Sequence, residues 1–167
     1  MRLSVAAALC LALLVACTDG ETRAKFRAEG AAMAPTIEDG EMVDVRAYDG
    51  RPPERGDIIV FRAPLSPNRS FIKRIIGLPG ETIAIRKSSG ALSISGEPHS
   101  EPYVQGTTGC AQTCTWTLPQ AGSPEAQEEC GSDRCYFVLG DNRQNSSDSR
   151  QGWLVPAENI LGFVAID

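Results

Sequence analysis

The chain has 167 residues, which fits one compact domain with room for a small insertion. Hydrophobic residues make up 42% of the sequence and charged residues 22%, so a core of ordinary size can form. The formal net charge is −5 and no stretch has the basic density of a nucleic-acid footprint, which excludes nucleic acid as a partner.

The first predicted element is an export signal at residues 1–16. Arg2 precedes an apolar run that is shorter than the roughly 20 residues of a membrane-spanning helix, but typical of a signal's apolar region. The run leads through small residues into Cys17, a pattern that resembles a bacterial lipobox, in which the cysteine is lipidated and becomes the mature N-terminus. Lipidation would attach the domain to a membrane surface through its N-terminus. An ordinary secretory signal or a short membrane anchor is the alternative. Either way, we expect a place in the bacterial cell envelope, facing the periplasm or the outside.

Residues 17–28 are polar and mixed in charge, and they predict a tether that has room for a helical turn. From Glu41 onward, short runs rich in β-branched residues alternate with turn residues, and no 3.6-residue period persists. The predicted strands are residues 42–45, 57–61, 71–76, 82–86, 92–95, 135–139 and 160–166. This pattern predicts a mostly β, largely antiparallel fold with closed or covered edges.

The composition changes between residues 96 and 134, which predicts an inserted, cysteine-rich subdomain between a core of residues 29–95 and its second part at 135–167. Within the insertion, residues 115–118 form one further candidate strand. Cys110, Cys114, Cys130 and Cys135 have a paired spacing that is compatible with zinc, but two disulfides fit an exported chain better, so we expect no metal. Four cysteines allow three pairings, and the sequence alone does not choose among them.

A lysine within an apolar run is the first candidate for chemistry. If the strand at 71–76 alternates, Lys73 lies on the face of Phe71 and Ile75, and Arg74 lies on the opposite face. One of the two cations is therefore expected on a buried face. Burial lowers a lysine's pKa and can make it a general base near neutral pH. A solvated lysine on an edge strand is the alternative from spacing alone.

A polar segment at residues 140–150 is the second candidate. Asp141, Arg143, Asp148 and Arg150 place two acids and two bases within ten residues. A turn held together by salt bridges is the simplest interpretation. Charged groups held in such a turn can also orient the groups of a site.

These segments and two others resemble, in order, the motifs of the bacterial signal peptidase I (leader peptidase) family. The first motif, at residues 30–37, has Ala-Met-Ala-Pro-Thr where the family has Ser-Met-x-Pro-Thr. Residues 73–80 form the second motif and match Lys-Arg-x-x-Gly-x-Pro-Gly, and residues 55–61 match a further strand motif. The third motif, at residues 140–150, matches Gly-Asp-Asn-Arg-x-x-Ser-x-Asp-Ser-Arg. The resemblance covers residues 29–167.

The resemblance implies a signal peptidase I-like antiparallel β catalytic core with a small disulfide-stapled insertion. It also implies a Ser–Lys endopeptidase that uses no cofactor and cleaves signal peptides of exported preproteins after small residues. By resemblance, Lys73 is the general base and Ser146 orients it. Four residues of the third motif support them: Asp141, Arg143, Asp148 and Arg150. For the substrate-binding surface we expect Gly30, Met33, Pro35, Ile58 and Val60.

One position breaks the family pattern. Ala32 stands where the family has its nucleophilic serine, and a methyl group cannot attack a carbonyl. The sequence therefore predicts a chain that binds signal peptides without cleaving them, and that would cleave them with a serine at position 32. Ala32 is compatible with an experimental serine-to-alanine substitution and with a natural, non-catalytic, peptide-binding membrane lipoprotein.

Overall fold

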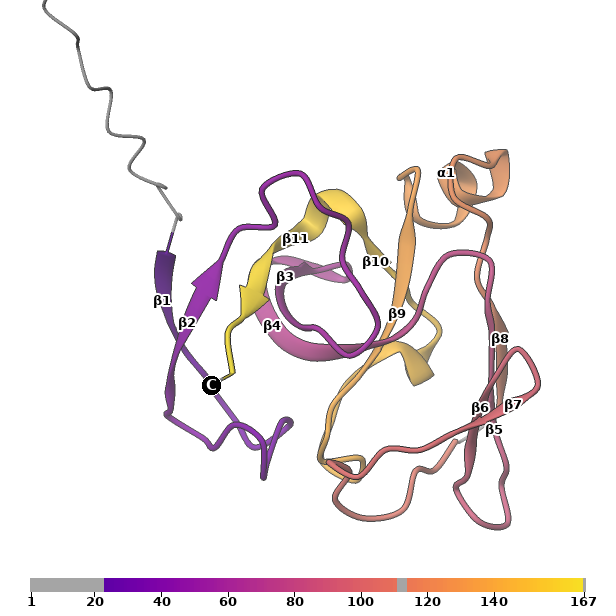
Figure 1. The fold of residues 1–167 in the computed structure, drawn as a ribbon, viewed down its shortest axis with the longest axis horizontal. Coiled ribbons are helices and arrows are strands. Elements are labelled where there is room, and N and C mark those ends of the chain that lie inside the picture. Colours follow the sequence, from indigo (N-terminus) through magenta and orange to yellow (C-terminus); the bar gives the residue numbers. More distant parts are fainter. Residues whose placement is uncertain (1–22, 111–113, 167) are drawn as a thin grey trace, which may run out of the picture.

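The computed structural model describes residues 23–110 and 114–166, and these residues form two antiparallel sheets (Figure 1). The large sheet has seven strands in the order β1-β2-β11-β3-β4-β9-β10. Their bounds are β1 (Arg23–Arg27), β2 (Met42–Arg46), β3 (Ile58–Ala63), β4 (Ser66–Gly77), β9 (Cys135–Leu139), β10 (Val155–Pro156) and β11 (Ile160–Val164). The predicted mostly β, signal peptidase I-like fold class is confirmed.

The small sheet has four strands in the order β7-β6-β5-β8, and it lies beside the β9 end of the large sheet (Figure 1). Their bounds are β5 (Thr82–Ile85), β6 (Leu92–Ile94), β7 (Glu97–His99) and β8 (Thr115–Thr117). The remaining elements are α1 (Pro124–Cys130) and two short 3₁₀ helices, Ser149–Gln151 and Ala157–Asn159. No helix in the described parts of the chain is long and apolar enough to cross a membrane.

The central strands of the large sheet are covered on both faces. In β3, Ile58 and Val60 pack into one core cluster, and Ile59 and Phe61 pack into another. The first cluster holds the segment before β2, and the second is closed by Trp153. Strands that are buried on both faces are expected to be continuously apolar, as the sequence of β3 is.

The predicted tether at residues 17–28 is wrong over its last part, because Arg23–Arg27 is strand β1. It pairs with all of β2, from Arg23 opposite Arg46 to Arg27 opposite Met42. Phe26 packs against the core. A strand with one apolar face and a charged outer face is stable at a sheet edge, although its composition is mostly polar. The predicted signal at residues 1–16 and lipidation at Cys17 lie outside the described residues.

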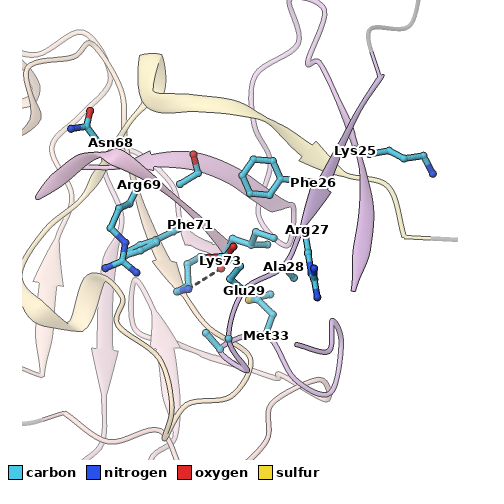
Figure 2. A pocket seen from close by; sticks show the side chains of 14 residues that line it. Lys25, Phe26, Arg27, Ala28, Glu29, Met33, Asn68, Arg69, Phe71 and Lys73 are labelled. Carbon is cyan, nitrogen blue, oxygen red and sulfur yellow. Dashed lines mark hydrogen bonds between the residues drawn. The ribbon is translucent and has the colours of Figure 1, made fainter. Parts of the chain in front are cut away.

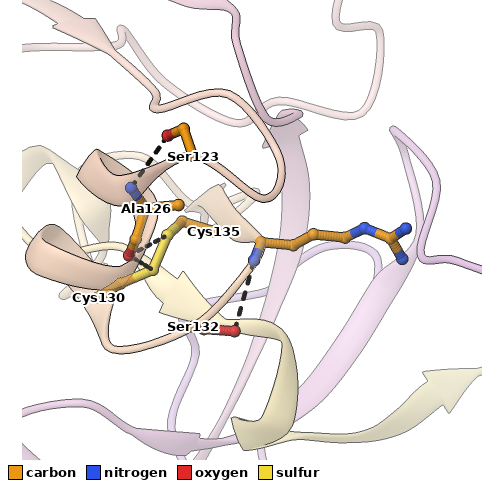
Figure 3. Close-up of a disulfide and its surroundings, with 6 residues drawn as sticks. Ser123, Ala126, Cys130, Ser132 and Cys135 are labelled. Carbon is orange, nitrogen blue, oxygen red and sulfur yellow. Dashed lines mark hydrogen bonds between the residues drawn. A yellow bond between two sulfur atoms is a disulfide. The ribbon is translucent and has the colours of Figure 1, made fainter.

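The cysteine-rich segment is connected to the rest of the fold by strand pairing. β8 pairs with β5, and β7 pairs with β6, so both extend the small sheet. The two disulfides join Cys110 to Cys114 and Cys130 to Cys135. In the second, the last residue of α1 is tied to the first residue of β9, beside the Ser123 cap (Figure 3). The expected boundary at residue 96 therefore falls inside a β-hairpin.

Candidate active site

The first motif forms a compact turn that is anchored from below by its apolar residues. Met33 and Ile37 are buried in the core cluster of Ile58 and Val60, and the Ile37 amide donates to the Met33 carbonyl at 3.0 Å. Between these anchors and Gly30, Ala32 stays partly exposed. The turn thus presents position 32 on a rigid support.

Lys73 lies on β4 and is 5% exposed. Its amine donates to the carbonyl of Ile72 at 2.8 Å and lies 5.2 Å from the centre of the Phe71 ring. Burial lowers the pKa of Lys73 to about 8, and the carboxylates of Asp148 and Asp141 oppose this shift. A lysine with this pKa holds a substantial neutral fraction in mildly basic solution, as a general base requires.

The expected burial of one cation is met by Lys73, and Arg74, the next residue, is buried as well. Its guanidinium donates to both carboxylate oxygens of Asp141, at 2.9 and 2.6 Å. Asp141 is fully buried, and it also accepts from the Thr36 hydroxyl at 2.5 Å. Both faces of β4 are covered here, so alternation along the strand does not expose either cation. The Arg74–Asp141 pair links the second motif to the third, and the Thr36 hydroxyl links the first motif to the third.

The third motif is held by a second buried carboxylate. Asp148 accepts from the Arg150 side chain at 2.8 and 2.9 Å and from the Gly140 amide at 3.2 Å. The Asn142 amide donates to the Ala32 carbonyl at 3.1 Å. The third motif therefore contacts the backbone of the position where the family has its nucleophile.

Ser146 reaches this region without the hydrogen bond that the resemblance implied. Its hydroxyl oxygen is buried and has no hydrogen-bond partner among the described residues. The Lys73 amine points to its own strand's carbonyl instead. Gly140 lies between the loop that carries Ser146 and the turn that carries Ala32. A Cβ atom at Gly140 would overlap the Ser146 hydroxyl and the Ala32 carbonyl. Only glycine permits this close approach.

Ala32 and Lys73 open into one groove with a volume of about 530 Å³. It is lined by residues 25–30, residues 68–73, Ala32 and Met33, and Figure 2 shows Lys73, Phe71 and Arg69 on one side with Met33 and Glu29 near them. β1 is the terminal strand of the large sheet. The outer edge of β4 pairs with β9 only from Arg74 onward. The groove thus lies between two strand edges that lack a partner strand in the described chain.

A family model described as "Signal peptidase, peptidase S26" matches residues 1–166. The chain belongs to this signal peptidase family. It is 38% identical over 146 residues to a signal peptidase I of Leptolyngbya laminosa, covering 80% of this chain and 63% of that one. It is 40% identical over 140 residues to "Signal peptidase I U" of Bacillus subtilis strain 168, covering 82% of this chain and 71% of that one.

A solved structure of a signal peptidase I from Enterococcus faecalis V583 gives the same result. It superposes with a TM-score of 0.52 and 32% sequence identity, covering 69% of this chain and 98% of that chain. The chain spans just under two thirds of the length of the signal peptidase I relatives from Leptolyngbya and Synechocystis, 63% in each case.

The residues expected at the binding surface of this signal peptidase family member divide into two groups. Gly30 and Met33 line the groove, and Pro35 is exposed on the outer side of the turn. Neither Ile58 nor Val60 lines the groove, because both side chains lie in the core next to Met33. β4 lines the groove, and the core side chains of β3 lie behind it.

Sequence reasoning missed the residues that surround the buried arginines. Glu101 forms an ion pair with Arg143, and the Tyr103 ring lies 3.9 Å from the Arg74 guanidinium carbon. Thr108 accepts from Arg143 at 2.5 Å. These residues belong to the cysteine-rich segment, where no motif pointed to the site.

The buried cation gives a first prediction about stability. Lys73→Met should raise the free energy of unfolding by about 3 kcal/mol at pH 6, since each unit of pKa shift corresponds to about 1.4 kcal/mol. The buried charge of Lys73 reduces the free energy of unfolding by its full amount below pH 8. The reduction becomes smaller as the pH rises toward the unfolded pKa of the lysine, near 10.5. Urea unfolding at pH 6 and pH 9.5 should therefore show a gain that shrinks with pH. The exposed Lys87→Met is the matched control; a Lys73→Met protein that is less stable at pH 6 contradicts the prediction.

Proposed function

We propose that this chain is a signal peptidase I-type Ser–Lys scaffold that binds signal peptides of exported preproteins and, with Ala32 in place of the nucleophile, does not cleave them. The observation that carries the proposal is a buried lysine of lowered pKa that lines the same groove as position 32. Residues of the first motif and Lys73 of the second line this groove, and the family relationship agrees with them.

Peptide binding by strand addition fits the groove. Two sheet edges that have no partner strand among the described residues border it, and backbone hydrogen bonds to such an edge give affinity for any extended peptide. Met33 and Phe71 offer apolar surface between the edges, which suits small apolar side chains of a peptide. Alternate side chains of the bound peptide would then face the groove.

The chemistry of the proposed dyad requires the missing hydroxyl. In a Ser–Lys peptidase the serine oxygen attacks the peptide carbonyl while its proton passes to the neutral lysine. The lysine then returns the proton to the leaving amine, and water hydrolyses the acyl-enzyme ester by the same route. With Ala32 no acyl-enzyme can form. Binding and polar stabilisation alone leave only about 10³–10⁴-fold over water in serine hydrolases, too little for useful amide cleavage.

A natural, non-catalytic lipoprotein that binds peptides is the second candidate. The arrangement of the lysine favours it, because the Lys73 amine donates to the Ile72 carbonyl and the Ser146 hydroxyl has no hydrogen-bond partner within the described parts of the chain. In this candidate Cys17 carries lipid and holds the domain at the membrane surface, facing the periplasm or the outside. Mass spectrometry of the mature N-terminus tests the anchor; an unmodified N-terminus elsewhere contradicts it.

A binding assay tests the proposal on the chain as it stands. A fluorescent signal peptide with small residues before its cleavage site should bind the protein, and mass spectrometry should recover it uncut. Ala32→Phe, which fills the groove, should weaken binding at least about tenfold. Ala91→Phe, at an exposed turn far along the chain, is the matched control. No detectable binding to the parent protein contradicts the proposed scaffold, and cleavage by the parent contradicts its inactivity.

A further inference from the structure

The cysteine-rich segment contributes a buried carboxylate to the surroundings of the site. Glu101 accepts two hydrogen bonds from the Arg143 guanidinium, at 2.8 and 2.6 Å. The Arg143 side chain is fully buried and that of Glu101 is 8% exposed. Two parallel hydrogen bonds between a guanidinium and a carboxylate fix distance and orientation together.

The same segment also covers the other buried arginine. The Tyr103 ring stacks on the Arg74 guanidinium, and its hydroxyl donates to Glu101 at 3.1 Å. Burial raises the pKa of Tyr103, with the Glu101 carboxylate adding to the effect. The hydroxyl therefore stays a hydrogen-bond donor. Tyr103 and Glu101 together join Arg74 to Arg143.

Backbone pairing fastens the segment to the third motif. The Gln105 amide donates to the Asp141 carbonyl at 3.0 Å, and the Arg143 amide donates to the Gln105 carbonyl at 3.3 Å. Arg150 donates to the Gly109 carbonyl at 3.1 Å. Glu101 is thus one end of a strap, residues 101–109, that lies along the third motif.

A short chain of contacts leads from Glu101 to position 32. Arg143 donates through its Nε to the Gly140 carbonyl at 3.0 Å. Gly140 in turn lies against the Ser146 hydroxyl and the Ala32 carbonyl, with no space for even a Cβ atom. A shift of Arg143 therefore moves Gly140 directly against both groups.

We propose that Glu101 is a positioning residue of the dyad, which holds Ser146 and the backbone of position 32 in place through Arg143 and Gly140. The inference rests on the proposed function, because it assigns Glu101 to that site. A buried ion pair alone is weak evidence for any role. The contacts of Arg143 with Gly140, and of Gly140 with both loops of the site, distinguish this pair from an ordinary structural one.

A double-mutant cycle in the Ala32→Ser protein tests the role. Glu101→Gln should lower kcat for a preprotein peptide about 10- to 100-fold, with KM within about twofold, because small misplacements at a site cost this much. Ser146→Ala should have an effect of similar size. If Glu101 acts through Ser146, the double variant should be little slower than either single variant. Fully additive effects overturn the proposal. Rates are normalised to the folded fraction, measured by circular dichroism.

Hydrogen exchange supplies a readout that needs no catalysis. In the chain as it stands, Glu101→Gln should speed exchange of the Asn142 amide, which donates to the Ala32 carbonyl, by about tenfold while the β3 amides stay protected. Glu97→Gln, an exposed glutamate of β7, is the matched control and should change nothing. Tyr103→Phe should give a smaller effect in the same direction. If the exchange rate of the Asn142 amide is unchanged, the proposal for Glu101 is overturned, even if the Ala32→Ser protein never cleaves a peptide. Absent peptide binding contradicts the proposed function alone.

Discussion

The Ala32→Ser variant should cleave preprotein peptides after small residues, and its kcat/KM should rise about tenfold per pH unit up to pH 8 and level off above it. The base must be neutral to accept the serine proton, and burial brings the pKa of Lys73 to about 8. At pH 6 only about 1% of such a lysine is neutral, so the rate there should be about 100-fold below the plateau. Initial rates across pH 5.5–10 measure the profile directly.

Two controls isolate the dyad in this experiment. Ala32→Ser combined with Lys73→Met should not cleave at any pH, since the serine then has no base, although the fold is expected to be more stable. Ala32→Gly should bind peptide as the parent does and remain inactive. A serine-restored protein that binds peptide but never cleaves it would show that Lys73 or the groove is wrongly assigned. A pH-independent rate would show that Lys73 is not the base.

The motifs could be predicted from sequence because each is a continuous segment with local rules. The strands at 42–46, 58–63 and 135–139 follow from runs of β-branched and aromatic residues between turn residues. The ion pair of Asp148 with Arg150 follows from one short segment. In each case the residues that decide the structure are near neighbours in the chain.

Features that depend on distant residues could not be predicted in this way. β1 is stable because Phe26 reaches a core built largely by β2, β3 and β4, which a polar composition does not reveal. Arg74 is buried because Asp141, 67 residues away, neutralises it. Glu101 meets Arg143 only through the path of the cysteine-rich segment. Alternation along β4 would show which residues share a face, but not that both faces are covered.

Asp141→Asn should lower the free energy of unfolding by about 3–5 kcal/mol, the largest stability effect expected in the described fold. The change leaves Arg74 as a buried cation without its counter-charge, which typically costs this much. Asp141 also accepts from Thr36, so one of the contacts between the first and third motifs is weakened as well. Urea unfolding at pH 7 with the disulfides intact measures the loss. Asp44→Asn removes an exposed partner of Lys25 and, as the matched control, should stay within about 0.5 kcal/mol.

The double variant Arg74→Met/Asp141→Leu separates the effect of this ion pair on stability from its effect on the alignment of the site. Removing both charges leaves no buried ion unpaired, so the double variant should recover most of the stability that Asp141→Asn loses. In the Ala32→Ser background it should nevertheless remain a poor peptidase, because Thr36 and Tyr103 lose the charged groups that align them with the third motif. Stability and activity should therefore diverge. A double variant that is as unstable as Asp141→Asn, or one that cleaves as fast as its parent, would show that the pair does not serve to align the site.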